Sequence, residues 1–163
     1  MIRGECNCGA VRFEVEGEPR GIYVCHCSIC RRATGAHGIA VLVVPKTSLR
    51  WLQGQEQMAQ WSKPGADWHT WFCRVCGSRV PGENDAHTLF VPAGCLTEGG
   101  EALRVRHHLF IGSKAAWDEI GDAGELHWEG LSSPASPAPQ GAQQRAESVV
   151  VDLLHQGQQA TDF

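Results

Sequence analysis

The strongest chemical signal in the chain is a set of three cysteines within six residues, Cys25-His26-Cys27-Ser28-Ile29-Cys30. Thiolates this close together suit a soft or borderline divalent ion, and zinc is the usual occupant because it accepts sulfur at a tetrahedral centre. If the backbone is extended from Cys25 to Cys27, the two thiols point to one side and His26 points to the other. The stretch therefore predicts a zinc site that is one protein ligand short, as catalytic zinc sites are.

Two further cysteine pairs each end in a glycine, Cys6-Asn7-Cys8-Gly9 and Cys73-Arg74-Val75-Cys76-Gly77. The glycine frees the backbone to turn its amide groups toward bound sulfur. Thiolates from two such knuckles, far apart in sequence, are the usual construction of a closed structural zinc site. We therefore expect two Zn²⁺ ions per chain, the structural one bound by Cys6, Cys8, Cys73 and Cys76.

The fourth position of the three-cysteine site has an alternative reading. Cys95, His37 or another histidine could complete the set and make a second closed site. Cysteine is among the most frequently buried residue types, so Cys95, between Gly94 and Leu96, fits a role in core packing better. The open three-cysteine site is the reading that we favour.

Composition and charge narrow the classes of partner. The chain has 18 acidic and 14 basic residues, a formal net charge of −4, and its lysines and arginines are scattered. This distribution argues against nucleic acid as the main partner. The N-terminal stretch lacks the apolar core of a signal peptide, and the longest apolar run, residues 39–44, is too short to span a membrane. We expect a cytoplasmic protein whose cysteines are metal ligands or reactive thiols, not disulfides.

Hydrophobic periodicity predicts a mainly β fold with few short helices. Period-two alternation is the mark of half-buried strands, and long helical periodicity is missing. A continuous β-branched run favours a strand that is covered on both faces. The predicted strands are residues 11–15, 23–24, 39–44 (the covered strand), 49–61 (two strands with a turn at Gly54), 89–93 and 103–111, with a short turn or helical piece at 31–35.

At 163 residues the chain is long enough for one domain with a proper core. We place this domain at residues 1–131. From Ser132 the composition shifts to proline, serine, alanine and glutamine, which predicts a linker and tail over 132–163. Within the tail, residues 145–156 could form one short helix or strand around 149–154, packed on its own domain or on a neighbour.

Four stretches together resemble one protein family: the CxC at 6–8, CxCxxCRRATGA at 25–36, WFCRVCGSR at 71–79 and FIGSKAAW at 110–117. This is the glutathione-dependent formaldehyde-activating enzyme family, which includes centromere protein V, and the resemblance covers residues 3 to about 129. It implies an Mss4-like tent of antiparallel sheets clipped by zinc knuckles. Two departures are Ala116, where family members often have proline before Trp117, and the tail after Ser132, which has no counterpart that we can place.

The resemblance also implies the division of metals that the residues suggest. In it, Cys6, Cys8, Cys73 and Cys76 match the ligands of the structural zinc. Cys25, Cys27 and Cys30 match the ligands of the catalytic zinc.

An open zinc site implies a chemistry. A substrate thiol that takes the fourth position has its pKa lowered and binds as thiolate, and its sulfur can attack an aldehyde carbonyl. We therefore expect a zinc-dependent carbon-sulfur lyase or synthase. It would act on a glutathione-like thiol and a formaldehyde-like aldehyde, forming or cleaving an S-hydroxymethyl adduct.

Residues near the motif have candidate roles. Arg31 and Arg32 could balance the zinc-thiolate charge or grip a glutathione carboxylate, and His26 and Ser28 are candidate proton carriers. For His107, His108 and Trp117 a core or surface role is favoured over pocket lining.

Two rival readings stay open. One is a non-catalytic zinc module that binds a protein partner, and the other is the same chemistry on a different thiol or aldehyde. Self-association into a homo-oligomer is also left open.

Overall fold

The computed structural model describes residues 1–131. Within this part of the chain the backbone forms twelve short strands, one α-helix and four short 3₁₀ helices, so the mainly β prediction is confirmed. The tail expected over 132–163, with its candidate helix or strand at 145–156, lies outside the described residues. No helix within residues 1–131 combines the length and the apolar character needed to cross a membrane.

The strands are β1 (Ile2–Glu5), β2 (Arg12–Val15), β3 (Ile22–Cys25), β4 (Ile39–Pro45), β5 (Leu49–Gln53), β6 (Met58–Ser62), β7 (His69–Cys73), β8 (Gly82–Glu83), β9 (Thr88–Pro92), β10 (Leu96–Glu98), β11 (Val105–Leu109) and β12 (Glu125–Leu126). The α-helix is α1 (Ser28–Thr34), and the 3₁₀ helices are η1 (Lys46–Ser48), η2 (Gln55–Gln57), η3 (Ala93–Cys95) and η4 (Ile111–Ser113).

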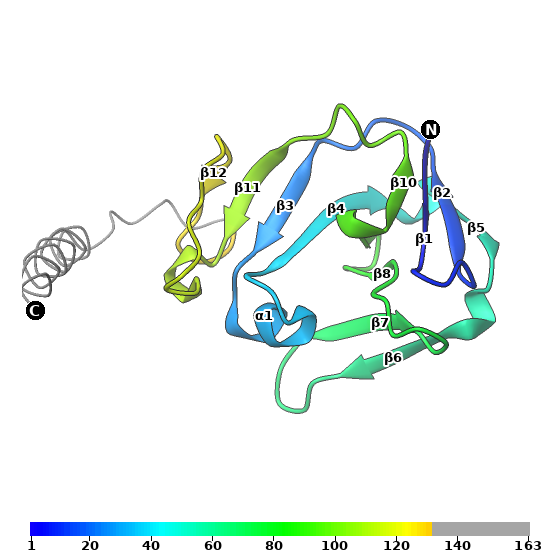
Figure 1. Ribbon diagram of the computed structural model, residues 1–163, viewed down its shortest axis with the longest axis horizontal. Coiled ribbons are helices and arrows are strands. Elements are labelled where there is room, and N and C mark those ends of the chain that lie inside the picture. The colour runs from blue at the N-terminus through cyan, green and yellow to red at the C-terminus, as the bar shows by residue number, and fades with distance from the viewer. Residues whose placement is uncertain (132–163) are drawn as a thin grey trace, which may run out of the picture.

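These strands form two sheets and one separate hairpin (Figure 1). The four-stranded sheet has the order β10-β1-β2-β5, and the six-stranded sheet has the order β12-β11-β3-β4-β9-β8. β6 and β7 pair only with each other. In Figure 1 this hairpin lies below the two sheets, with α1 close to β7.

One correction concerns strand direction. The expected fold consists of antiparallel sheets, but β11 pairs in parallel with β3 on one side and with β12 on the other. Parallel neighbours need a crossover connection. Here the chain between β3 and β11 supplies seven intervening strands and α1, so the six-stranded sheet is mixed.

The main core lies between the two sheets. Ile2, Phe13 and Val15 come from the four-stranded sheet and are almost completely buried. They meet Leu42, Val44 and Val91 from the six-stranded sheet. Burial of this many large apolar side chains provides the main stabilising contribution, at roughly 1.5–3 kcal/mol for each.

The run at residues 39–44 is a correction to the prediction of a strand covered on both faces. Only Leu42 and Val44 are buried, and the alternate residues Ile39, Val41 and Val43 are partly exposed. These three side chains line a cavity on the other face of the sheet. The two faces of this apolar strand therefore have different environments: one is buried in the core and the other lines a cavity.

β2 also departs from strict alternation. Glu14 is buried beside Phe13 and Val15 instead of facing solvent. Its carboxylate accepts a hydrogen bond from Arg50 Nε at 2.8 Å, across the β2–β5 pair. A buried carboxylate is tolerated because this charged partner satisfies it.

Candidate active site

The three-cysteine motif lies where β3 gives way to α1. Cys25 is the last residue of β3, Cys27 is the N-cap of α1, and Cys30 is inside the helix. The Cys30 amide donates to Cys27 Sγ at 3.4 Å, which caps the helix with a thiol in place of a hydroxyl. Gly35 ends the helix in the left-handed conformation. The short helical piece expected near residues 31–35 thus begins earlier, inside the motif.

The three thiols converge on one point. The Sγ atoms of Cys25, Cys27 and Cys30 all lie within 4.8 Å of one another. Among residues 1–131, no fourth histidine, cysteine or carboxylate ligand atom joins this group. His37 is exposed, and Cys95 donates from Sγ to the Arg79 carbonyl at 2.8 Å. Neither of the two residues considered as closing ligands is part of the cluster.

The proximity of the thiols changes their acidity in opposite directions. Hydrogen bonds from the Cys25 and Cys30 side chains hold the pKa of Cys27 well below its usual range. The same interaction with Cys27, seen from the other side, raises the pKa of Cys25. The Cys27 thiolate is thus favoured, and the ionisation of Cys25 beside it is opposed. A bound cation removes that opposition, because it stabilises several thiolates at once.

The cluster opens into a cavity of about 410 Å³. Cys25 and Cys30 form part of its wall, together with Tyr23 of β3 and Trp68 from the turn before β7. The partly exposed side chains of β4 line the same cavity. The size and the mostly apolar walls with a few reactive groups are typical of a small-molecule site.

A second cavity, of about 540 Å³, lies on the hairpin side of α1 and shares Trp68 and Thr70 with the first. Three of the residues that line it are basic: Arg32, Lys63 and Arg79. Positive side chains gathered around one hollow favour an anionic ligand.

Arg79 is the functional candidate that sequence reasoning missed. Its guanidinium donates to Thr70 Oγ1 at 2.6 Å and to the Ala33 carbonyl, so it joins β7 to α1. Burial lowers the pKa of Arg79, and the charge of Cys30 nearby opposes that effect. Arg79 is the last residue of the WFCRVCGSR stretch, which the sequence singles out for its two cysteines. Only the fold brings its side chain near Cys30.

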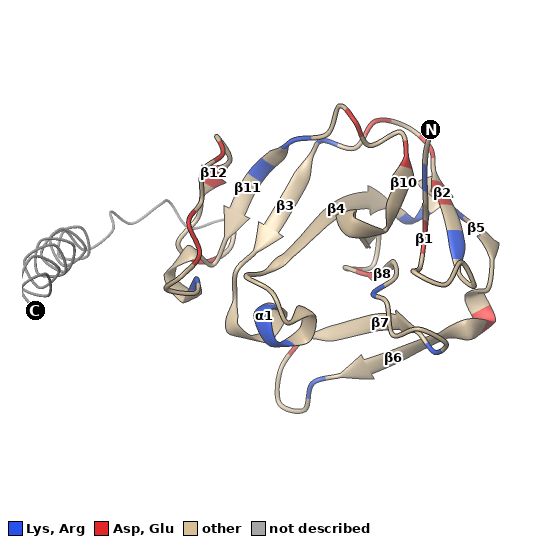
Figure 2. Ribbon diagram, in the orientation of Figure 1, with Lys and Arg blue, Asp and Glu red and all other residues tan. Residues whose placement is uncertain are grey.

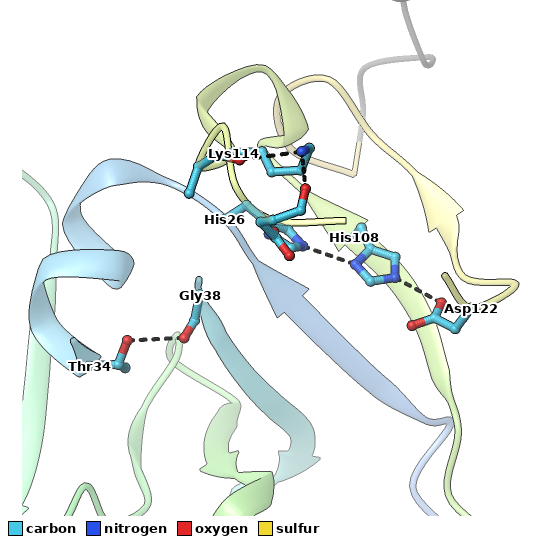
Figure 3. A network of polar contacts seen from close by, with 8 residues as sticks. His26, Thr34, Gly38, His108, Lys114 and Asp122 are labelled. Carbon is cyan, nitrogen blue, oxygen red and sulfur yellow. Dashed lines mark hydrogen bonds and ion pairs between the residues drawn. The ribbon is translucent and has the colours of Figure 1, made fainter. Parts of the chain in front are cut away.

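His26 points away from the thiols, as the extended backbone predicts. Its side chain is buried, with Nε2 2.9 Å from His108 Nδ1 and Nδ1 2.9 Å from Asp118 Oδ2. His108 Nε2 lies in turn 2.9 Å from Asp122 Oδ1, so the contacts form a chain between β3, β11 and the following loop (Figure 3). Burial lowers the pKa of His26. This arrangement holds the motif in place, and His26 lines neither cavity.

The remaining candidates lie around this centre. Ser28 is the first residue of α1, and Arg31 is half-buried without lining either cavity. The Trp117 side chain is 70% exposed, so it is a surface residue. On the other side of α1, Thr34 Oγ1 donates to the Gly38 carbonyl at 3.0 Å, which closes the loop into β4 (Figure 3).

The four knuckle cysteines form a second cluster. The Sγ atoms of Cys6, Cys8, Cys73 and Cys76 lie within 4.8 Å of one another. The Val11 amide points at Cys6 Sγ at 3.3 Å, which is the amide-to-sulfur arrangement expected of a knuckle. Cys6, Cys73, Val11 and Val80 make a small buried cluster of their own.

Ser78 joins the two knuckles. Its hydroxyl accepts from the Asn7 amide at 3.0 Å and lies 3.2 Å from Cys76 Sγ. The Ser78 hydroxyl lowers the pKa of Cys76 to about 6. A thiol that ionises near neutral pH is ready to bind a cation.

The sulfur spacing of this cluster fits zinc. Ligands about 2.3 Å from a tetrahedral zinc ion lie roughly 3.8 Å from one another. The Cys6–Cys8 and Cys8–Cys73 sulfur distances are 3.5 and 3.9 Å. Both cysteine clusters could therefore hold a metal ion, one with four protein ligands and one with three.

Comparison with known proteins agrees with these features. The family model described as "Glutathione-dependent formaldehyde-activating enzyme" matches residues 1–113. A curated protein of Halomonas elongata, provisionally named a glutathione-dependent formaldehyde-activating enzyme, is 45% identical over 42 residues, which are 25% of this chain and 27% of that protein. A crystal structure of a Rhodobacter sphaeroides protein shares 26% identity, covers 63% of this chain and 90% of its own, and superposes with a TM-score of 0.48.

The family match spans more than half of the chain and includes all seven clustered cysteines. The protein therefore belongs to the glutathione-dependent formaldehyde-activating enzyme family.

Proposed function

We propose that the protein is a zinc-dependent carbon-sulfur lyase or synthase that joins a glutathione-like thiol to formaldehyde or a similar aldehyde. One observation carries the proposal: three thiols converge without a fourth ligand among residues 1–131, and two of them, Cys25 and Cys30, form part of the wall of a cavity. Family membership supports the choice of thiol and aldehyde. The curated relative supports it over the short stretch that it shares.

The reaction needs little from the protein beyond position and charge. The thiol sulfur forms a bond to the aldehyde carbon, the carbonyl π bond breaks, and the thiol proton ends on the new hydroxyl oxygen. A zinc ion bound by Cys25, Cys27 and Cys30 would supply the positive charge that keeps an incoming thiol ionised at neutral pH. Trp68 lines the cavity together with Cys25 and Cys30, so a bound thiol would contact its indole.

The basic cavity suits the rest of a glutathione-like substrate. Glutathione has two carboxylates in addition to its thiol, and Arg32, Lys63 and Arg79 line the hollow that adjoins the thiol cluster through Trp68. Carboxylates there would make charge-assisted hydrogen bonds. Arg79 also lies close enough to Cys30 to offset part of the thiolate charge. Carboxylate binding was expected of Arg31 and Arg32. We assign it to Arg32 together with Lys63 and Arg79, which lie outside the three-cysteine motif.

Thiol binding is tested with cobalt in place of zinc, because sulfur-to-cobalt charge transfer is visible in the near ultraviolet. Glutathione should strengthen these bands, whereas S-methylglutathione, which keeps both carboxylates but lacks the thiol, should leave them unchanged and compete with glutathione. Formaldehyde added to the thiol-bound form should then alter the spectrum and yield the S-hydroxymethyl adduct faster than the uncatalysed mixture. If glutathione leaves the spectrum unchanged, the open-site reading is wrong and a closed zinc module that binds a protein partner becomes the better account.

The role of the basic cavity has its own test. Arg79→Met should weaken glutathione binding in the same titration by about 10-fold, the loss expected for a charge-assisted contact. Arg20→Met removes the same charge from an exposed position away from both cavities and serves as the control. Equal affinities for the two variants would contradict the carboxylate-binding role without touching the thiol chemistry.

A further inference from the structure

A third group of potential metal ligands lies at the edge of the six-stranded sheet, away from both cysteine clusters. It consists of His107 on β11, Glu125 on β12 and His127 just after β12. In the parallel β11–β12 pair, His107 lies opposite Glu125. Side chains two residues apart on a strand share a face, so Glu125 and His127 point the same way as His107. Pairing and register alone therefore bring the three side chains together.

The distances are those of a shared ligand set. His107 Nδ1 lies 3.0 Å from His127 Nε2, and Glu125 oxygens lie 3.5 Å from His107 Nδ1 and 3.9 Å from His127 Nε2. Nitrogen and oxygen ligands about 2.1 Å from one ion are separated by roughly 3.0–3.4 Å in octahedral or tetrahedral geometry. The two imidazole nitrogens already have that spacing, and the exposed Glu125 side chain must move closer for one of its oxygens to reach it.

The backbone holds the histidines firmly. The His127 amide donates to the His108 carbonyl at 2.8 Å, and the Ile111 amide donates to the His127 carbonyl at 3.1 Å. The His127 side chain is only 6% exposed, while Glu125 is 68% exposed. Two imidazoles on a hydrogen-bonded backbone, with an exposed carboxylate beside them, make a site that an ion can enter from solvent.

The local charge favours a cation. Five acidic residues and one lysine lie between residues 114 and 129. Figure 2 shows the acidic positions along the chain on either side of β12. Their summed field attracts positive ions to this edge of the sheet.

We propose that His107, Glu125 and His127 bind a divalent first-row transition ion such as Zn²⁺, independently of the two cysteine clusters. Two imidazole nitrogens and one carboxylate oxygen suit zinc and its neighbours in the series, and the harder calcium and magnesium ions prefer all-oxygen sites. The Tyr23 ring stacks on His107 with centroids 5.0 Å apart and also lines the cavity of the thiol cluster. An ion that fixes the His107 ring thus also fixes one wall of that cavity.

The test uses the full chain after its cysteine clusters have been saturated with zinc. Further zinc is added while the imidazole nitrogens are followed by ¹⁵N NMR. His107 Nδ1 and His127 Nε2 should shift together and saturate at one equivalent. Glu125→Gln, an exposed substitution compatible with folding, should weaken this step by at least about 10-fold. Glu119→Gln removes the same charge from a nearby exposed position that is not a ligand, so it should weaken the affinity far less, by less than about 2-fold.

His107→Gln provides a second variant, because this side chain is partly exposed. It should remove the additional equivalent of zinc from the metal analysis and leave the thiolate-held metal in place. The proposal is overturned if the two imidazoles do not shift together, or if Glu125→Gln and Glu119→Gln bind the added zinc equally well. Both results leave the assignment of the cysteine clusters untouched.

Discussion

At the scale of single residues, the two cysteine clusters differ in the structure that surrounds each sulfur. Cys73 is completely buried at the end of β7, and Cys76 is tied through Ser78 to the opposite knuckle. Cys27 is the N-cap of α1, and the two other thiols of its cluster belong to regular elements, Cys25 to β3 and Cys30 to α1. Loss of a ligand should therefore have different consequences in the two places.

We expect Cys76→Ser to misfold, because it removes a ligand that joins two distant hairpins, and structural zinc contributes on the order of 10 kcal/mol to small domains. Cys27→Ser should stay folded and lose only the metal of the open site. Circular dichroism melts and metal analysis of both variants check this. Equal loss of melting temperature in the two variants would contradict the division into a structural and an open site.

At the scale of elements, short turns decide how the knuckles meet the sheets. Gly54 lies between β5 and η2 with φ at 77°. A Cβ at this position would lie 1.8 Å from the Ala10 carbonyl oxygen, beside the first knuckle. Gly17 also has a positive φ, 87°, but a Cβ there would meet nothing within 4 Å. A substitution at Gly17 therefore tests the cost of the backbone conformation alone. A substitution at Gly54 tests that cost together with a steric clash.

Gly17→Ala should cost about 1 kcal/mol, the penalty for a left-handed residue with a side chain. Gly54→Ala pays the same penalty and must also displace the knuckle backbone, so it should cost about 1–3 kcal/mol more. Urea denaturation of the two variants measures the difference in free energy of unfolding. A Gly54→Ala variant as stable as Gly17→Ala would mean that the turn does not pack on the knuckle as described.

The β8–β9 turn contributes to the free energy of unfolding in a way that depends on pH. Asp85 accepts from the His87 amide at 2.7 Å, from the Thr88 amide at 2.8 Å and from the Thr88 hydroxyl at 2.6 Å. These hydrogen bonds, that of the Thr88 hydroxyl first, hold the pKa of Asp85 well below its ordinary value of 3.8.

Because the folded state holds the ionised form, the contribution is fully present above the unfolded pKa. It is lost as the pH falls below about 4 and through the lowered pKa of the folded state. A ¹³C titration of the Asp85 carboxyl should give a midpoint far below that of an ordinary aspartate. Asp85→Asn should remove this titration and leave those of the other carboxyls in place. A midpoint near 3.8 would show that the turn does not hold the carboxylate.

At the scale of the whole molecule, the four-cysteine cluster joins the beginning of the chain to its middle. Cys6 and Cys8 follow β1 in the four-stranded sheet, whereas Cys73 ends β7 of the separate hairpin and Cys76 follows it. The hairpin pairs with neither sheet, so this clip and the Arg79 contacts with Ala33 and Thr70 help to hold it in place. A metal at the four-cysteine cluster is therefore coupled to the global fold.

Mild chelation should remove the metal of the three-cysteine cluster first and leave the fold intact. Release from the four-cysteine cluster requires the knuckles to separate. The experiment is best done with Glu125→Gln, so that only thiolate-held metal is counted. Metal analysis and circular dichroism should show one equivalent lost with the secondary structure unchanged. Simultaneous loss of both equivalents together with the fold would argue against two distinct sites.

The sequence by itself determined the parts of the site that are local. Three thiols in six residues must be neighbours, and extended backbone before α1 turns His26 away from them. The knuckle glycines Gly9 and Gly77 both have positive φ, as their turns require. Hydrophobic patterns located β2, β3, β4, β5, β6, β9 and β11, because a half-buried strand imposes its period on the sequence directly, and they did not locate the other described strands.

Only the tertiary structure decided what depends on the pairing of distant segments. The parallel contacts of β11 with β3 and β12 have no local signature, and they alone bring His107 to Glu125. Arg79 reaches Ala33 and the surroundings of Cys30 because the β6–β7 hairpin folds against α1. Likewise, Val41 and Val43 are as apolar as Leu42 and Val44, yet they face an open cavity. Hydrophobic periodicity reports which side chains share a face, and only the packing of the sheets determines whether that face is covered.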